Sequence, residues 1–202
     1  MKVFGIGLNK TGTTTLNYCL RSLGYRHLTH NAKALTDWTQ GRKDDVFALI
    51  DQYDSFDDWP YPLMYRELHA RYPEAKFILT VRRDAKSWLR SLKKHSLNTS
   101  PTRHHRKMAY GFDYPFGHEQ HHIDFYHNHN ASVKAFFEEK GEQDRLLTLC
   151  WENGDGWREL APFLGVPEPD EAIPRANEAR PISWTNPRQL QNRFRAGFWG
   201  RI

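Results

Sequence analysis

The sequence predicts an α/β fold with a central parallel sheet flanked by helices and a helical or loop cap over one side. An N-terminal strand at residues 3–6 runs into a glycine-bearing loop and a helix. A nearly continuous apolar run at residues 76–81 is typical of a strand in the middle of a parallel sheet. Predicted strands also alternate with predicted helices along the chain, which favours a parallel sheet covered by helices.

The loop after the first strand is predicted to bind a phosphate group. Gly7 and Gly12 allow backbone angles that other residues avoid, so the N–H groups between them can turn toward one anion. The helix that begins near Thr13 points its positive end at the same place, and Lys10 adds a mobile full charge.

This loop departs from the nucleotide-hydrolase pattern G-x-x-x-x-G-K-[ST]. The spacing from Gly7 to Gly12 and the hydroxyl of Thr14 are kept, but Thr13 stands where that pattern has a lysine, and the cation is at Lys10. No acidic strand end for magnesium is evident later in the chain. The loop is therefore suited to a phosphate but poorly suited to hydrolysing ATP or GTP. A plain strand-to-helix connection is the alternative.

Apolar spacing and the residues that end helices predict the remaining elements. Helices are expected at 15–23, at 32–50 in two pieces broken at Gly41, at 63–72, through 88–92, at 124–140 and at 157–164. Strands are expected at 25–30, near 53–56, at 76–81 and at 145–151. The strand at 25–30 is expected to lie beside the first strand, which would bring His30 near the loop.

One basic residue and a pair of adjacent acidic residues compete for the role of a general base. His30 ends the second predicted strand, where a histidine can accept a proton at neutral pH. Asp57 and Asp58 precede the bend at Pro60, and one of them could act as a base, an orienting group or an acceptor-binding residue. The alternatives are that His30 caps the next helix or bonds a loop, and that the two aspartates are solvated turn residues.

A second anion site is predicted where the 76–81 strand ends. Arg82 and Arg83 follow that strand directly, and arginine at such a position is a good anion ligand. Arg83 and Ser91 are eight residues apart, so they can converge on a second phosphate. Arg83 is the predicted ligand, and one arginine of the pair could instead form an ion pair with Asp84 or another acid.

Residues 93–130 are polar, irregular and rich in histidine, and they are predicted to form a cap insertion. The aromatic loop at 110–117 could line an acceptor pocket. His118, His121 and His122 have neither the spacing nor the cysteine support of a specific metal site, so no metal is predicted. Residues 1–178 are expected to form one domain, and 179–202 a basic C-terminal arm.

The length, net charge and composition of the chain limit the classes of function that it can have. A chain of 202 residues fits a single domain. The net charge of +5 favours an anionic ligand or partner, and one phosphorylated ligand accounts for it as readily as nucleic acid does. Cys19 and Cys150 form no disulfide framework, the start does not resemble a signal peptide, and no apolar run approaches the roughly 18 residues of a membrane span. A cytoplasmic protein without a membrane partner is predicted.

Several separated motifs resemble the P-loop sulfotransferases, which move a sulfuryl group from 3′-phosphoadenosine 5′-phosphosulfate (PAPS) to a hydroxyl or amine. The resemblance is closest to compact bacterial members and spans roughly residues 1 to 178. Residues 7–14 look like the family's 5′-phosphosulfate loop, and residues 83–91 look like its 3′-phosphate motif. Residues 58–60 ahead of 72–82, and 156–167 with 174–177, look like two further family stretches. Ala85 departs from the family pattern, which has proline there.

The resemblance implies a P-loop NTPase-like three-layer fold and in-line sulfuryl transfer without metal, with PAPS as donor and PAP as product. The implied donor-binding residues lie in the two motifs and are Asn9, Lys10, Thr11, Gly12, Thr13, Thr14, Thr15, Arg83 and Ser91. Catalysis falls to Lys10, which stabilises the leaving group, and to His30 or Asp58 as the base. The acceptor is expected to be a small molecule rather than nucleic acid. A P-loop small-molecule kinase and a non-catalytic nucleotide or polyanion binder are the alternatives.

Overall fold

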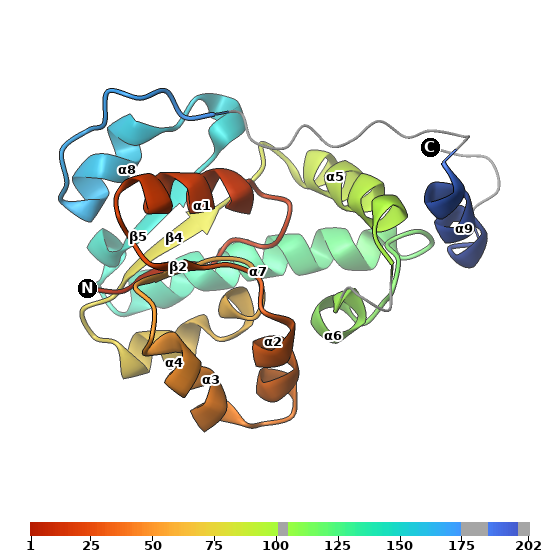
Figure 1. The fold of residues 1–202 in the computed structure, drawn as a ribbon, viewed down its shortest axis with the longest axis horizontal. Helices are drawn as coiled ribbons and strands as arrows, with labels where there is room; N and C mark the ends of the chain where they lie inside the picture. The colour runs from red at the N-terminus through yellow and green to blue at the C-terminus, as the bar shows by residue number, and fades with distance from the viewer. Residues whose placement is uncertain (101–104, 175–185, 198–202) are drawn as a thin grey trace.

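The computed structural model describes residues 1–100, 105–174 and 186–197. At its centre lies a parallel sheet of five strands in the order β2-β3-β1-β4-β5 (Figure 1). The strands are β1 (Val3–Gly5), β2 (His27–Leu28), β3 (Ser55–Phe56), β4 (Lys76–Thr80) and β5 (Leu146–Leu149). The predicted α/β fold with a parallel, helix-flanked sheet is confirmed.

Helices cover both faces of this sheet. They are α1 (Thr13–Ser22), α2 (Ala32–Thr39), α3 (Lys43–Ile50), α4 (Tyr65–Arg71), α5 (Ala85–Asn98), α6 (Arg106–Tyr110), α7 (Glu119–Glu139), α8 (Trp157–Leu164) and α9 (Pro187–Arg195). Short 3₁₀ turns are η1 (Tyr61–Leu63), η3 (Gln143–Arg145) and η4 (Trp151–Asn153). Within the described ranges, no helix is long and apolar enough to cross a membrane.

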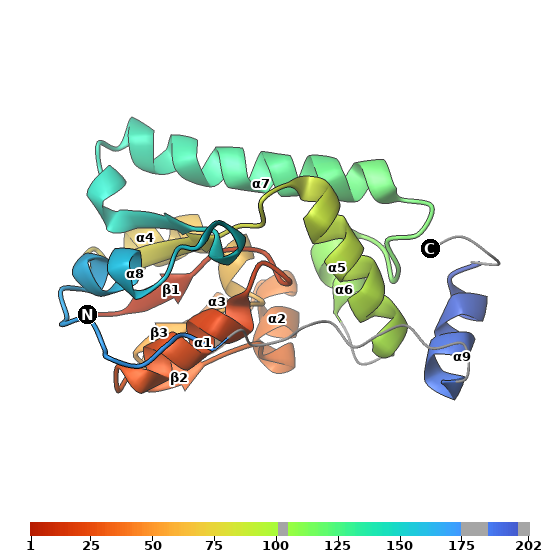
Figure 2. The ribbon, with the colours of Figure 1, turned by 90° about the horizontal axis from the view of Figure 1, so that it is seen from above.

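The strand sequences explain why the sheet is covered on both sides. Successive side chains of a strand point to opposite faces, so fully apolar strands need partners on each. Phe4 and Phe77 pack with residues of α3, α4 and α7, whereas Val3 and Ile78 pack with residues of α1 and α8. Figure 2 shows α7 along one side of the sheet and α1 along the other.

The strand order corrects one prediction. β2 does not lie beside β1, because β3 pairs in parallel with both of them, with Ser55 in register with Val3 on one side and with His27 on the other. Ser55 and Phe56 are fully buried, and a buried strand must satisfy its backbone groups along both edges. In this strand order β3 is the neighbour of β1 and β2 is one strand further away. Asp58, which follows β3, therefore lies nearer to the first loop than His30, which follows β2.

The polar stretch at 93–130 is more helical than predicted. α5 continues to Asn98, and α7 begins at Glu119 rather than near residue 124. In both cases a few inward side chains define the helix, such as Leu97 on α5 and His122 with Tyr126 on α7. Their helical spacing is masked in the sequence by polar neighbours on the outer face.

The predicted C-terminal arm contains the helix α9, which packs on α5. Gln189 Nε2 donates to Asn98 Oδ1 at 2.8 Å, and Asn192 Nδ2 donates to the backbone oxygen of Leu97 at 2.8 Å. Residues 175–185 and 198–202 of the chain lie outside the described residues.

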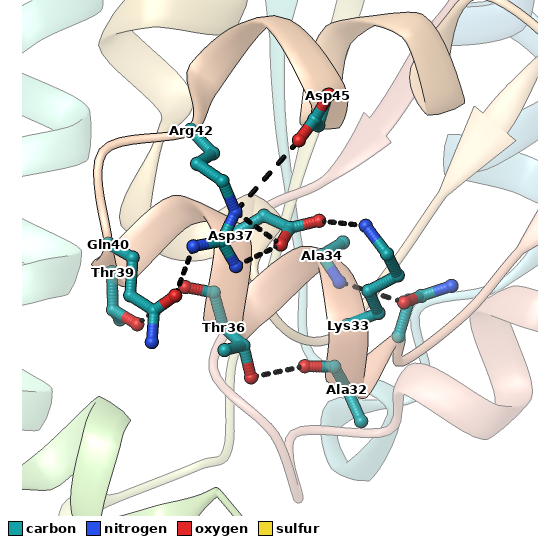
Figure 3. A network of polar contacts seen from close by, with 10 residues as sticks. Ala32, Lys33, Ala34, Thr36, Asp37, Thr39, Gln40, Arg42 and Asp45 are labelled. Atoms are coloured by element: carbon teal, nitrogen blue, oxygen red, sulfur yellow. Dashed lines mark hydrogen bonds and ion pairs between the residues drawn. The ribbon is translucent and has the colours of Figure 1, made fainter.

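A carboxylate at the end of α2 joins this helix to α3 (Figure 3). Asp37 accepts hydrogen bonds from Lys33 Nζ at 2.6 Å and from Arg42 Nε at 3.0 Å. Both bonds favour the ionised form and lower the pKa of Asp37. Asn31 caps the start of α2 by accepting from the N–H of Ala34, so the cap is the residue after His30. These contacts fix the helix that follows His30.

Candidate active site

The loop between β1 and α1 is held against the end of β4. Lys10 and Gly12 adopt left-handed backbone angles, with φ of 70° and 100°. The Thr11 hydroxyl donates to the backbone oxygen of Leu8 at 2.5 Å and lies 2.7 Å from Thr80 Oγ1. These contacts give the loop a fixed shape, with Gly12 as the N-cap of α1.

Two side chains from outside the loop bind its carbonyl groups. Trp88 Nε1 donates to the backbone oxygen of Asn9 at 2.9 Å, and Arg82 Nε donates to that of Lys10 at 2.9 Å. The peptide group is planar and trans, so each N–H points away from the carbonyl of the same unit. The N–H of Lys10 therefore points away from Trp88.

Several loop N–H groups are left for a ligand. In the described part of the chain, the backbone N–H groups of Lys10, Gly12 and Thr13 donate to no acceptor. The last of these belongs to the first turn of α1, where the helix carries its positive end. Successive donors of this kind around a left-handed residue form an anion-binding arrangement.

Lys10 supplies the full positive charge of this arrangement. Its side chain is half-buried and forms no ion pair within the described residues. Burial lowers the pKa of Lys10; the charge of Asp58 opposes this shift and that of Arg82 adds to it. An anion placed in the loop would reverse this penalty, because it would favour the charged ammonium.

Asp57 is an interior structural residue. It is fully buried, accepts a hydrogen bond from the Thr29 hydroxyl at 2.5 Å, and lies 3.4 Å from His27 Nε2. His27 Nδ1 in turn lies 2.8 Å from Ser55 Oγ. This network joins β2 to β3 and leaves Asp58 as the aspartate of the pair that can meet a ligand.

Asp58 is placed beside the loop by β3, the direct neighbour of β1. It has a left-handed φ of 63°, and its Oδ1 accepts from the N–H of Trp59 at 2.8 Å. Burial, and next the charge of Asp57, raise the pKa of Asp58 to about 7, against the opposing effects of that N–H and of Lys10. A carboxyl group with such a pKa can take up a proton near neutral pH.

His30 lies one strand further out, after β2. Its ring centroid is 5.9 Å from that of His105, which directly precedes α6. Burial, and then the charge of His105, lower the pKa of His30. The chain thus brings His30 to the cap, whereas the electrostatic partner of Lys10 is Asp58.

The two strand-end arginines have different surroundings. Arg82 forms an ion pair with Glu152, and its Nη2 lies 3.3 Å from Ser91 Oγ, in addition to its bond to the loop. Arg83 is exposed; its backbone N–H donates to Glu152 at 3.0 Å, but its guanidinium forms no ion pair or hydrogen bond to the described residues. Arg82 is therefore committed to the protein, and Arg83 keeps its donors for a ligand.

Four side chains around the loop were not predicted from the sequence to contact it: Trp88, Tyr110, Trp151 and Glu152. Tyr110 was predicted only as part of an aromatic loop that could line an acceptor pocket. The indole of Trp151 lies against Gly12, where an added Cβ would come 2.5 Å from its Nε1. Trp151 and Glu152 come just after β5, with only Cys150 between, so the rule that ligands meet the carboxyl ends of parallel strands could have found them. Trp88 and Tyr110 had no such signal, because their contacts to Asn9 join residues far apart in the chain.

The histidines near the cap make local contacts. His118 stacks on Phe112 with ring centroids 3.6 Å apart, and His121 Nε2 lies 3.0 Å from the backbone oxygen of Tyr110. His122 Nδ1 lies 2.8 Å from the backbone oxygen of His118. Among the residues that the structure describes, no three His, Cys, Asp or Glu side chains are placed to hold a metal ion.

Comparison with known proteins matches this arrangement to one family. The family model described as "Sulfotransferase domain" matches residues 2–182. Ava biosynthesis cluster protein M from Aspergillus versicolor is 28% identical over 214 aligned residues, which cover 86% of this chain and 80% of that protein. The matched residues include the loop with Lys10, Asp58 and the segment from Arg82 to Ser91. The chain belongs to the family of proteins with a sulfotransferase domain.

Proposed function

We propose that the protein transfers a sulfuryl group from PAPS to a hydroxyl or amine of a small molecule. The main support is the set of unpaired N–H groups of Lys10, Gly12 and Thr13 beside the Lys10 ammonium, in a chain of the sulfotransferase family. This donor set fits the 5′-phosphosulfate, and the uncommitted guanidinium of Arg83 fits the 3′-phosphate.

When bound, PAPS supplies the sulfuryl group and leaves as PAP. The acceptor oxygen or nitrogen forms a bond to sulfur as the bond from sulfur to the bridging phosphate oxygen breaks. Lys10 and the loop N–H groups stabilise the negative charge that grows on this bridging oxygen. Asp58 receives the acceptor proton, because it follows the strand next to β1 and its pKa lies near neutral pH.

Calorimetric titration tests the donor class directly. Wild-type protein is titrated with 3′,5′-adenosine bisphosphate, and separately with ATP plus magnesium, at two salt concentrations. We expect tight, metal-independent binding of the bisphosphate that survives moderate salt, because a fitted site depends less on counterion release than a nonspecific polyanion surface does. A preference for ATP with magnesium, or no nucleotide binding, would reject the proposal.

The role of Asp58 predicts a pH dependence. We expect kcat/KM to rise with pH and to level off above about pH 7, because the base must be ionised. Asp58→Asn should lower kcat/KM by about 10²-fold or more and remove this step. His30→Gln is the matched comparison and should keep the step. The base assignment would be reversed if His30→Gln removed the step and Asp58→Asn kept it.

Asp58→Asn should raise the stability of the protein at neutral and higher pH, although it lowers kcat/KM. Because the pKa of Asp58 is raised on folding, its favourable contribution is present at low pH and is lost as the pH rises toward about 7. Asp58→Asn should therefore unfold near the wild-type temperature at pH 4 and several degrees above it at pH 8. Scanning calorimetry of the ligand-free proteins measures this difference.

Arg83→Ala should weaken donor binding with little change in kcat. A charge-assisted hydrogen bond is worth about 1.5 to 3 kcal/mol, so the KM for PAPS should rise by about tenfold or more. Arg90→Ala is the control, because it removes an exposed arginine from the same segment and should change KM less than about twofold. Equal effects in the two variants would indicate a general loss of positive charge rather than a ligand contact.

A further inference from the structure

We propose that Tyr110 of the cap helix α6 is a positioning residue for the phosphate loop, acting through the side chain of Asn9. The hydroxyl of Tyr110 donates a hydrogen bond to Asn9 Oδ1, across 101 positions of sequence. The inference rests on the proposed function, since binding of the donor nucleotide is the property that the loop shape controls.

The Tyr110 ring is fixed before its hydroxyl reaches the loop. It is 2% exposed and meets aromatic rings on several sides. Its ring centroid lies 5.3 Å from that of Trp59, 6.0 Å from Trp88, 5.4 Å from His122 and 5.2 Å from Phe125. These neighbours come from the turn after β3, from α5 and from α7, so several parts of the protein determine where the hydroxyl lies.

Asn9 is bound at both of its oxygens. The backbone oxygen accepts from Trp88 Nε1, and the side-chain oxygen accepts from Tyr110. The two aromatic residues also contact one another, so they hold Asn9 from one side. With the oxygen occupied in this way, the amide NH₂ of Asn9 is turned from Tyr110 and donates to no acceptor in the described residues.

Fixing Asn9 matters because the next residue is Lys10. Lys10 has a left-handed φ of 70°, which a residue with a side chain rarely adopts unless its surroundings enforce it. Without the Tyr110 hydroxyl, the Asn9 side chain would lose one of the contacts that enforce this shape. The N–H of Lys10 and its ammonium would then be less well preorganised for an anion.

The same cap segment also reaches the other candidate base. His105, directly before α6, has its ring beside that of His30, and α6 lies next to α2 (Figure 1). The cap helix therefore contacts the loop at one end and the segment at His30 at the other. Burial, and then the charge of Asp58, raise the pKa of Tyr110 well above its usual value, so its hydroxyl remains a donor at working pH.

The test compares two tyrosines of this segment. Tyr110→Phe keeps the ring and removes the hydroxyl, whereas Tyr114→Phe removes a hydroxyl that donates to Asn192 Oδ1 on α9 at 2.9 Å. We expect Tyr110→Phe to weaken binding of 3′,5′-adenosine bisphosphate by about fivefold and to raise the KM for PAPS by a similar factor, at unchanged acceptor KM. Tyr114→Phe should bind the bisphosphate as wild type does.

Asn9→Ala tests the route of the effect. It removes the other partner of the hydrogen bond and should weaken bisphosphate binding by at least as much as Tyr110→Phe does. The double variant should bind no more weakly than Asn9→Ala alone, because both changes remove one interaction. Asn9→Ala leaves Tyr110 unchanged, so it keeps the inference testable if Tyr110→Phe does not fold: wild-type affinity for the bisphosphate in Asn9→Ala would overturn the positioning role.

The outcomes separate the two proposals. Wild-type protein that binds no bisphosphate would reject the proposed function, and this inference with it. Wild-type protein that binds the bisphosphate, together with a folded Tyr110→Phe variant of unchanged affinity, would overturn the positioning role alone. Additive losses in the Asn9 and Tyr110 variants would also overturn it.

Discussion

Replacing Lys10 with alanine is expected to lower kcat by about 10²- to 10³-fold, the range seen when one transition-state donor is removed. Lys10 is the cation within the loop, and its charge matters most when negative charge grows on the leaving oxygen. In the proposed function, the bound donor would still have the loop N–H groups and Arg83 as partners before the reaction. Binding of 3′,5′-adenosine bisphosphate should therefore weaken much less than turnover does.

Stability should not fall with activity in this variant. Burial lowers the pKa of Lys10, which means that the folded protein holds the ammonium at some cost in free energy. Lys10→Ala should therefore unfold at or slightly above the wild-type temperature. A collapse in kcat together with an unchanged unfolding temperature would distinguish a catalytic role from a structural one.

The control for this experiment is Lys86→Ala. Lys86 is exposed in the first turn of α5 and is not part of the loop, so the substitution makes the same change in charge at a residue outside it. It should leave kcat within about twofold of wild type. If Lys10→Ala retained kcat within about tenfold, the leaving group would have to be stabilised by another cation.

The sequence predicted the elements whose signals are local. The buried run at Lys76–Thr80 and the strand, loop and helix from Val3 to Ser22 were found because apolar spacing and glycine positions lie within one segment. The break between α2 and α3 was found in the same way, at Gly41. The helical content of the 93–130 stretch was missed, since few apolar residues mark the inner faces of α5 and α7.

Strand order was beyond local signals. Two-residue strands such as β2 and β3 carry too little pattern to show which of them pairs with β1. The position of β3 decides how the two candidate bases are placed, because it brings Asp58 to the loop and leaves His30 at the cap. Sequence reasoning could therefore name both candidates but had no means of ranking them.

The side chains that hold the phosphate loop in place were equally hard to identify from the sequence. Trp88, Tyr110 and Glu152 act through contacts to residues 69 to 101 positions away. Sequence reasoning proposed residues that would touch the donor from their types and spacing, and this assignment stays a prediction. The residues that hold this set in place are ordinary aromatic and acidic side chains, and only the fold assigns them that role.

Gly7→Ala is expected to have the largest effect on stability. A Cβ at this position would overlap the hydroxyl and the backbone oxygen of Thr80 and would come 2.7 Å from its backbone nitrogen. Thr80 cannot move aside, because it ends β4 and is in register with Leu149 of β5. The free energy of unfolding should fall by about 3 kcal/mol or more, measured by chemical denaturation.

Two further variants test whether the backbone of β4 causes the loss of stability in Gly7→Ala. Gly156→Ala is the control: its Cβ would meet only Ile173, at an ordinary 3.4 Å, so the free energy of unfolding should change by less than about 1 kcal/mol. Adding Thr80→Ala to Gly7→Ala removes the hydroxyl but leaves the backbone oxygen and nitrogen in place, so it should not restore stability. If Thr80→Ala restored the stability of Gly7→Ala, β1 and β4 would be able to separate at this point. The backbone of the phosphate loop would then be less rigidly held than its close contact with Thr80 implies.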